Sequence, residues 1–189
     1  MTTAPADPMA ELQALLDKQQ IRELVLNYSR GVDRKDFALL RTLYAEGATD
    51  DHGGLFRGPA TEYIDWLQQA MEACEMTSHS VHNHLIGLES ATRAHGEVYV
   101  TAYQRLHGGS EGFAELVQGL RYLDLYEKRD GLWQFARRTL INDWTQIGTA
   151  FWDLEHPVMK GTPVGRADAA DPSYQWLPHA AFARRQQSN

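Results

Sequence analysis

The sequence predicts an α+β fold, in which helices of the N-terminal half pack on a curved antiparallel sheet formed by the C-terminal half. Apolar residues recur at helical spacing up to about residue 74, whereas polar and apolar residues alternate as in strands from His79 onward. The segment 128–131, Lys-Arg-Asp-Gly, is a strong signal for a β-hairpin. Because the helices precede the strands instead of alternating with them, the order argues against an α/β fold.

The first predicted helix covers residues 9–33 and ends at an acid. One apolar stripe runs along it at helical spacing, formed by Ile21, Leu24, Val25, Tyr28 and Val32. If the helix continues through Gly31, Asp33 lies about 100° round from Val32, at the margin of this stripe, where it can be partly desolvated. Asp33 could instead cap the next helix, with Asp36 completing an imperfect capping box.

The other predicted elements follow in chain order. They are a helix over 36–45, a polar strand over 48–52, a helix over 60–74 and strands over 79–90, 96–107, 113–127 and 132–144. A Gly-rich turn is expected at 108–112. We expect residues 1–8 to be disordered, 9–147 to form one domain, and 148–189 to form an extension packed on this domain or on a partner subunit. The extension can bury apolar surface through four aromatic residues: Phe151, Trp152, Tyr174 and Trp176.

Composition excludes several classes of function. A net charge of −7 with scattered Lys and Arg offers no basic face for nucleic acid or anionic lipid. No run is long enough to cross a membrane, and the N-terminus lacks the pattern of a signal peptide. The sole cysteine, Cys74, rules out an internal disulfide and fits a cytoplasmic protein. We expect Cys74 to lie in a helix as a small buried hydrophobic residue.

Three segments together resemble the SnoaL-like branch of the nuclear transport factor 2-like superfamily. They are Tyr28 to Asp33 at the helix end, Ser78 to Asn83, and Tyr122 to Trp133. The resemblance covers about residues 9–147. This branch is similar to scytalone dehydratase, bile-acid 7α-dehydratase and lindane dehydrochlorinase, and it includes polyketide cyclases and lyases acting on lignin-derived aromatics. The resemblance implies a cone-shaped α+β barrel with an apolar pocket between the sheet and the helices, commonly in a dimer or trimer.

The resemblance also assigns site residues. It places the catalytic Asp-His pair of the dehydratases at Asp33 and His79, and the helix tyrosine of the bile-acid enzyme at Tyr28. His52 falls where the scytalone enzyme has a pocket tyrosine, and His107 falls near that enzyme's second histidine. A histidine at position 52 removes a phenolic donor, so the substrate cannot be carried over from a relative.

These residue types suit an elimination. The reaction needs a base near neutral pH to take a proton from carbon, and a donor to assist the departing oxygen. A carboxylate such as Asp33 fixes the tautomer of a histidine such as His79 and stabilises its cation. His79 can then remove the proton and return it to the leaving hydroxyl, while Tyr28 hydrogen-bonds the substrate oxygen. The alternative for His79 is a strand-end residue bonded to backbone.

Further candidates lie on the strands. By the two-residue period, Asp50 and His52 share one strand face and are candidates to contact substrate, unless they belong to a solvated edge strand. Tyr122 shares a face with Asp124 and Tyr126. If this face lines the interior, we expect Tyr122 to contact ligand. Asp124 could instead pair with an arginine of the neighbouring strand, Arg137 or Arg138. Trp133, Phe135 and Trp144 are typical of a core, although Trp144 is also a candidate for substrate contact.

No metal and no cofactor is expected. His82 and His84 should share a strand face and His79 should point away from both, so one ion could not bind all three. No phosphate-binding loop, nucleophile elbow or dinucleotide fingerprint is present in the sequence.

Three classes of function follow. The leading prediction is a cofactor-independent lyase, a dehydratase or similar, acting on a hydrophobic hydroxylated ring compound such as a steroid, a polyketide or a lignin-derived aromatic. The second is an isomerase or cyclase that uses the same acid-base residues. The third is a non-catalytic module for small-molecule binding or assembly, because a fold does not fix a function. In each case we expect a homodimer or homotrimer.

Overall fold

The computed structural model describes residues 7–107, 113–149, 163, 165–168, 170–172 and 174. Its helices are α1 (Pro8–Asp33), α2 (Phe37–Leu43) and α3 (Ala60–Ala70), followed by a 3₁₀ turn, Met71–Ala73. Its strands are β1 (Tyr44–Asp51), β2 (Arg57–Pro59), β3 (Cys74–Leu88), β4 (Arg93–His107), β5 (Phe113–Arg129) and β6 (Leu132–Thr149). The predicted order of helices first and sheet afterwards is therefore confirmed. The turn at 108–112 and the aromatic residues Phe151, Trp152 and Trp176 lie outside the described residues.

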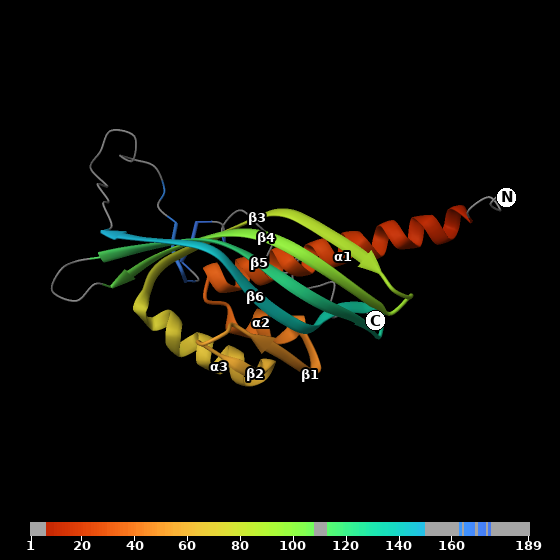
Figure 1. Cartoon of the computed structure of the whole chain (residues 1–189), viewed down its shortest axis with the longest axis horizontal. Coiled ribbons are helices and arrows are strands. Elements are labelled where there is room, and N and C mark those ends of the chain that lie inside the picture. The colour runs from red at the N-terminus through yellow and green to blue at the C-terminus, as the bar shows by residue number, and fades with distance from the viewer. Residues whose placement is uncertain are drawn as a thin grey trace.

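The six strands form one open sheet in the order β2-β1-β6-β5-β4-β3. The long strands β3 to β6 are antiparallel neighbours, as predicted. They curve around α1, whose first turns extend beyond the sheet (Figure 1). Within the described residues β2 and β3 are edges, so the helices pack on a cone-like sheet that does not close into a barrel.

The sheet is mixed, because β1 pairs in parallel with β6. The predicted antiparallel pairing of the C-terminal strands is confirmed, whereas the parallel pairing of β1 was not predicted. Local sequence patterns indicate a strand but do not carry the direction of its partner. The parallel register places Asp50 beside Arg138, which also pairs with Asp124 of β5 on its other side.

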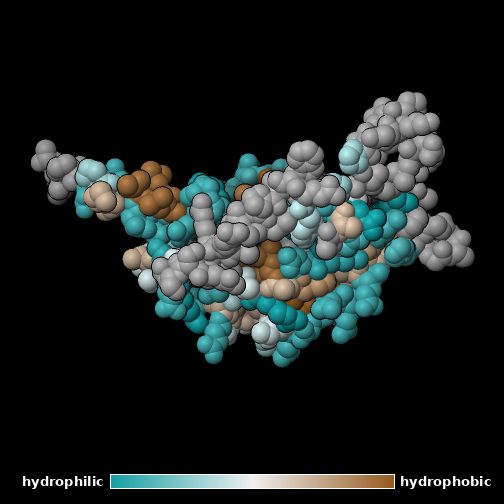
Figure 2. Space-filling model, turned by 180° about the vertical axis from the view of Figure 1, so that it is seen from behind, coloured by the Kyte–Doolittle hydropathy of each residue, from teal (hydrophilic) through white to brown (hydrophobic). Residues whose placement is uncertain are grey.

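The inner side of α1 forms the centre of the core. The predicted stripe is buried along its whole length, with Tyr28 only 1% exposed. Farther toward the N-terminus the helix is not covered, and exposed apolar side chains form a patch there (Figure 2). This patch consists of Met9, Leu12, Leu15 and Leu16. Within the described residues, no helix is long and apolar enough to cross a membrane.

The residues that follow α1 decide whether Asp33 caps the next helix. Asp36 is the N-cap of α2, because its carboxylate accepts the backbone N–H of Leu39 at 2.9 Å. Asp33 is the last residue of α1 and does not cap α2. It is therefore available for another partner.

Two expectations for the start of the sheet were wrong. Cys74 begins β3 instead of ending a helix, although it is buried as predicted and burial raises the pKa of its thiol. The pairing of β3 with β4 shifts register between Val81 and His84. The expectation that His82 and His84 share a face and His79 points away was therefore wrong. His79 and His84 both bond to inner-face partners, whereas His82 bonds to Thr101 on the outer face.

The predicted β5–β6 hairpin turn is confirmed by its backbone. Asp130 and Gly131 have φ values of 49° and 81°, as a two-residue turn with left-handed residues requires. We expect Gly131→Ala to destabilise the fold by about 1–2 kcal/mol, because an L residue is strained in this region. Gly54→Ala is the control, since a Cβ there meets no atom within 4 Å and φ is not positive. Urea unfolding of both variants measures the difference, and equal midpoints would contradict the expectation.

Candidate active site

The inner face of the sheet has an apolar middle between two polar ends. Three residues paired across β3, β4 and β5 form the middle: Val81, Val100 and Leu120. His79 precedes Val81 by two residues on the same face of β3, and it is in register with the small residue Ala102. Arg138 lies on the other side, in register with Asp124. A ligand bound over the middle of this face would therefore lie between His79 and Arg138.

Asp33 and His79 form a doubly bonded pair between α1 and β3. The Nδ1 of His79 lies 2.6 Å from Asp33 Oδ1, and the backbone N–H of His79 donates to Asp33 Oδ2 at 2.9 Å. The histidine side chain is 6% exposed and the carboxylate 13%. The second bond fixes the carboxylate against the strand, so the aspartate holds the ring in one orientation.

This geometry decides which nitrogen of His79 can act as a base. An ionised carboxylate only accepts hydrogen bonds, so Nδ1 carries the proton that it shares with Asp33. Nε2 is then the nitrogen that can take a proton, and the carboxylate stabilises the imidazolium that results. The alternative of a histidine bonded only to backbone was wrong.

Asp50 and His52 form a second acid–histidine pair, at the end of β1. The Nδ1 of His52 lies 2.5 Å from Asp50 Oδ1, and the Tyr44 hydroxyl donates to Asp50 Oδ2 at 2.6 Å. The predicted shared face is confirmed, and it points into the core: the carboxylate of Asp50 is fully buried. The solvated edge strand, which was the alternative, is excluded by this burial.

A chain of phenols connects this second pair to α1. Tyr63 of α3 has its hydroxyl 3.3 Å from His52 Nε2 and 2.6 Å from the hydroxyl of Tyr28. Its ring also stacks on that of His52, with centroids 4.8 Å apart. Desolvation raises the pKa of Tyr28 to about 12 and holds the pKa of Tyr63 well above its usual value. Both phenols are therefore neutral donors near neutral pH.

Arg138 is the charged centre of the opposite end. Its guanidinium is fully buried and donates twice to Asp124, from Nε at 2.9 Å and from Nη2 at 2.7 Å. Its Cζ lies 4.0 to 4.2 Å from the ring centroids of Tyr28, Tyr122 and Phe135. The π faces of these rings stabilise the guanidinium, which is shielded from water.

His84 extends the Arg138 cluster to β3. Its Nε2 lies 3.1 Å from the hydroxyl of Tyr126, which donates to Asp124 at 2.8 Å. Burial lowers the pKa of His84 to about 4, so the ring is neutral at physiological pH. Because the single hydrogen of the Tyr126 hydroxyl goes to Asp124, His84 Nε2 carries a hydrogen and donates it to the Tyr126 oxygen, without adding charge.

Two predicted site residues lie away from the Asp33–His79 pair. His107 ends β4, exposed, five residues beyond the partner of His79, or roughly 17 Å along the strand. Trp144 is 51% exposed and lies over Gly119, on the face opposite the buried Leu120. The expectation that Trp144 belongs to the core was wrong, because a register shift in β5–β6 beside Gly119 turns it outward.

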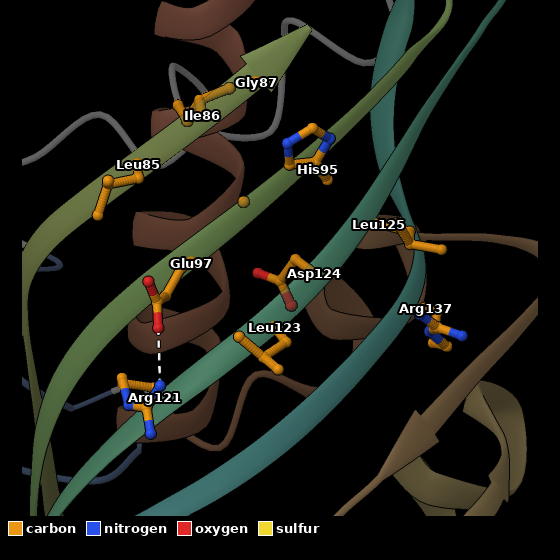
Figure 3. Close-up of a pocket in the computed structure, with 11 residues that line it drawn as sticks. Leu85, Ile86, Gly87, His95, Glu97, Arg121, Leu123, Asp124, Leu125 and Arg137 are labelled. Carbon is orange, nitrogen blue, oxygen red and sulfur yellow. Dashed lines mark hydrogen bonds and ion pairs between the residues drawn. The ribbon is translucent and has the colours of Figure 1, made fainter. Parts of the chain in front are cut away.

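A groove opens on the outer face of the sheet, away from these clusters. Figure 3 shows it in front of the strands, with α1 passing behind them, and its volume is about 730 Å³. Arg121 crosses it to Glu97 at 2.7 Å. Leu85 and Leu123 form much of its exposed apolar surface. The groove and the Asp33–His79 pair therefore lie on opposite faces.

The described part of the C-terminal extension contacts the end of α1. The buried carboxylate of Asp171 lies 3.3 Å from Nε of Arg34, the residue after Asp33. The ring of Tyr174 lies 5.2 Å from the guanidinium of Arg30. These contacts place residues 171 and 174 within one helical turn of Asp33.

Sequence reasoning missed three contributors to the site. They are Tyr63, which lies among the apolar residues of α3, Tyr44 of β1, and Arg138, for which the sequence indicates only a pairing with Asp124. A signal for Arg138 is present, since strand alternation places it on the same face as Leu140. A charged residue on an inward face indicates a buried partner.

Among the described residues, no three His, Cys, Asp or Glu side chains converge as metal ligands would. The two histidine pairs each use one nitrogen for a carboxylate. Their geometry is that of acid-base pairs.

The chain belongs to the SnoaL-like domain family, whose model matches residues 13–139, and hence to the nuclear transport factor 2-like superfamily. The match covers more than half of the chain and contains Asp33, His79, Asp50, His52 and Arg138.

Solved structures of low identity share the fold. A protein of Novosphingobium aromaticivorans, provisionally described as a scytalone dehydratase, is similar at 24% identity with a TM-score of 0.65, over 71% of this chain and 89% of its own. The type 3 hexachlorocyclohexane dehydrochlorinase LinA of Novosphingobium barchaimii is similar at 20% identity and a TM-score of 0.67, over 75% and 96%. A variant of Rv3472 of Mycobacterium tuberculosis, a protein of unknown function, is similar at 18% identity and a TM-score of 0.60, over 96% of both chains.

Proposed function

We propose that this protein is a cofactor-independent lyase that eliminates water, or a comparable leaving group, from a hydrophobic hydroxylated ring compound. The observation that carries the proposal is the bonding of Asp33 to both the ring and the backbone of His79. This bonding leaves Nε2 as a base whose cation is stabilised by a neighbouring carboxylate. The ring substrate could be a steroid, a polyketide or a lignin-derived aromatic.

In the proposed reaction His79 acts as base and then as acid. Nε2 takes a proton from the carbon next to the one that carries the hydroxyl, the C–H electrons form the double bond, and the C–O bond breaks. The same proton then passes from the imidazolium to the departing oxygen, which leaves as water. Asp33 keeps its negative charge throughout and lowers the energy of the imidazolium. The phenol of Tyr28, carried by the helix that also holds Asp33, is proposed to hydrogen-bond the substrate oxygen.

The names of two relatives and the apolar middle of the sheet face support an elimination. The names of two structural neighbours, a scytalone dehydratase and a hexachlorocyclohexane dehydrochlorinase, denote loss of water and of hydrogen chloride. These reactions differ in leaving group but share removal of a proton from carbon, the step for which His79 is placed. The apolar residues between His79 and Arg138 suit a ring substrate.

The test combines a ligand-independent measurement with an activity screen. In NMR spectra of 15N-labelled protein, the hydrogen of the neutral His79 ring is expected on Nδ1 in the wild type and on Nε2 in Asp33→Asn, because the carboxylate that accepts from Nδ1 is gone. A panel of hydroxylated ring ketones is then screened for the ultraviolet absorbance of a conjugated product. Turnover that is lost in His79→Ala supports the lyase.

Other outcomes separate the remaining classes of function. Isomerised or cyclised product without loss of oxygen would replace the lyase by an isomerase or cyclase. Binding of panel compounds without any turnover would favour a binding module. An unchanged position of the His79 ring hydrogen in Asp33→Asn would remove the proposed catalytic pair.

A further inference from the structure

The Asp50–His52 pair lies at one end of a buried hydrogen-bond chain that ends on α1. Asp50 accepts from Tyr44 on one oxygen and from His52 Nδ1 on the other, so the carboxylate fixes which ring nitrogen carries a hydrogen. His52 Nε2, Tyr63 and Tyr28 then follow in series. His52 directly follows β1, Tyr63 lies in α3 and Tyr28 lies in α1.

The direction of the chain depends on one proton. When His52 is neutral, Nε2 has a lone pair and accepts from the Tyr63 hydroxyl. Tyr63 has only one hydrogen, so its oxygen accepts from the Tyr28 hydroxyl. The hydrogen of Tyr28 then points back along the chain, and its oxygen can only accept from a ligand.

Protonation of His52 reverses each of these bonds. Nε2 now carries a hydrogen and donates to the oxygen of Tyr63, and the Tyr63 hydroxyl donates to the oxygen of Tyr28. The hydrogen of Tyr28 is released from the chain. Arg138, which faces the ring of Tyr28 with its Cζ 4.2 Å from the centroid, has no acceptor to offer it. Tyr28 becomes a donor toward a ligand oxygen.

Charged, buried side chains lie beside the Asp50–His52 pair. The parallel register of β1 and β6 sets Asp50 beside Arg138, and the antiparallel register of β5 and β6 sets Asp124 on its other side. The three side chains are fully buried and carry two negative charges and one positive charge. The groups facing His52 are Asp50 of β1, Tyr63 of α3 and Tyr122 of β5, whose ring centroid is 6.2 Å away.

We propose that Asp50 and His52 are positioning residues that control, through Tyr63, whether Tyr28 donates or accepts a hydrogen bond in the active site. Protonated His52 sets the donor state, in which Tyr28 binds the oxygen of a carbonyl or of a departing hydroxyl. Neutral His52 sets the acceptor state, in which Tyr28 has no hydrogen to donate to such an oxygen. The effect on turnover rests on the proposed elimination, whereas the reversal of the chain is a property of the free protein.

The reversal is measured by NMR in the free protein, with 15N-labelled histidine and tyrosine labelled at 13Cζ. In the wild type the Cζ signals of Tyr63 and Tyr28 are expected to shift with the midpoint of the His52 titration. In Tyr63→Phe the chain is cut, so His52 still titrates while Tyr28 loses the shift. A Tyr28 signal that is flat in the wild type, or that still follows His52 in Tyr63→Phe, would overturn the proposal.

Tyr122→Phe is the matched control. Its ring packs against those of Tyr28 and His52, with centroids 5.9 and 6.2 Å apart, but Tyr122 is not a link of the chain. Removal of its hydroxyl is expected to leave the shift of Tyr28 coupled to His52. Loss of coupling in this variant would show that packing carries the effect, and the chain would be rejected.

Turnover gives a second and separate readout. If a panel compound is eliminated, the pH dependence of kcat/KM is expected to follow the His52 midpoint in the wild type and to lose that dependence in Tyr63→Phe, with KM changed less than kcat. An unchanged profile in Tyr63→Phe would reject the role in turnover. If no compound is eliminated by the wild type, the proposed function fails, while the coupled NMR shifts still decide the reversal.

Discussion

Asp33→Asn is expected to lower kcat/KM for the elimination by about 10³- to 10⁴-fold, as the wrong histidine tautomer does in other enzymes. The amide can still accept the backbone N–H of His79 through its oxygen. Its NH₂ group, however, would donate to Nδ1 and force the ring hydrogen onto Nε2, the nitrogen that must act as base. Steady-state kinetics on the substrate found by the screen measures the loss.

The control for this variant is Asp36→Asn. Asp36 lies three residues farther along the chain and caps α2, a role that asparagine also performs well. We expect it to retain activity close to that of the wild type. Comparable losses in both variants would show that the region, and not the carboxylate of Asp33, matters for turnover.

Arg138→Met is expected to destabilise the protein by about 3–5 kcal/mol, because it leaves the buried carboxylate of Asp124 without its counter-charge. Loss of the cation between the rings of Tyr28, Tyr122 and Phe135 adds to this cost. The change in free energy of unfolding is obtained from urea denaturation followed by circular dichroism.

Arg121→Met is the matched substitution on the outer face. Arg121 donates to Asp143 at 2.7 and 2.8 Å and to Glu97 at 2.7 Å, but these partners are in contact with water. Arg121→Met is expected to lower the free energy of unfolding only slightly, since exposed ion pairs contribute little to stability. A loss in Arg138→Met as small as in Arg121→Met would show that Asp124 does not remain a buried, unpaired charge.

Much of the fold could be predicted because local patterns determine its elements. The stripe ending at Val32 predicts the inner side of α1, and Asp130-Gly131 predicts the β5–β6 turn. The features that could not be predicted depend on contacts between distant segments. The parallel pairing of β1 and the register shift after Val81 are decided by neighbouring strands and have no local signature.

The same division holds for the site. Asp33 and His79 could be proposed from the sequence, since the resemblance and the chemistry both select them. Asp50 and His52 could be placed on one face from the strand period alone. The connection through Tyr63 could not be foreseen, because a tyrosine within an apolar helix stripe gives no sign that its hydroxyl meets a histidine from another element.

The parallel pairing of β1 with β6 also has a consequence for folding. Asp50 lies beside Arg138, so the contact closes a loop of nearly ninety residues, and ordering such a loop is slow. During synthesis α1, β1 and α3 leave the ribosome long before β6, and the carboxylate of Asp50 then has no guanidinium beside it. The contact between Asp50 and Arg138 therefore forms only when β6 inserts between β1 and β5 and completes the sheet.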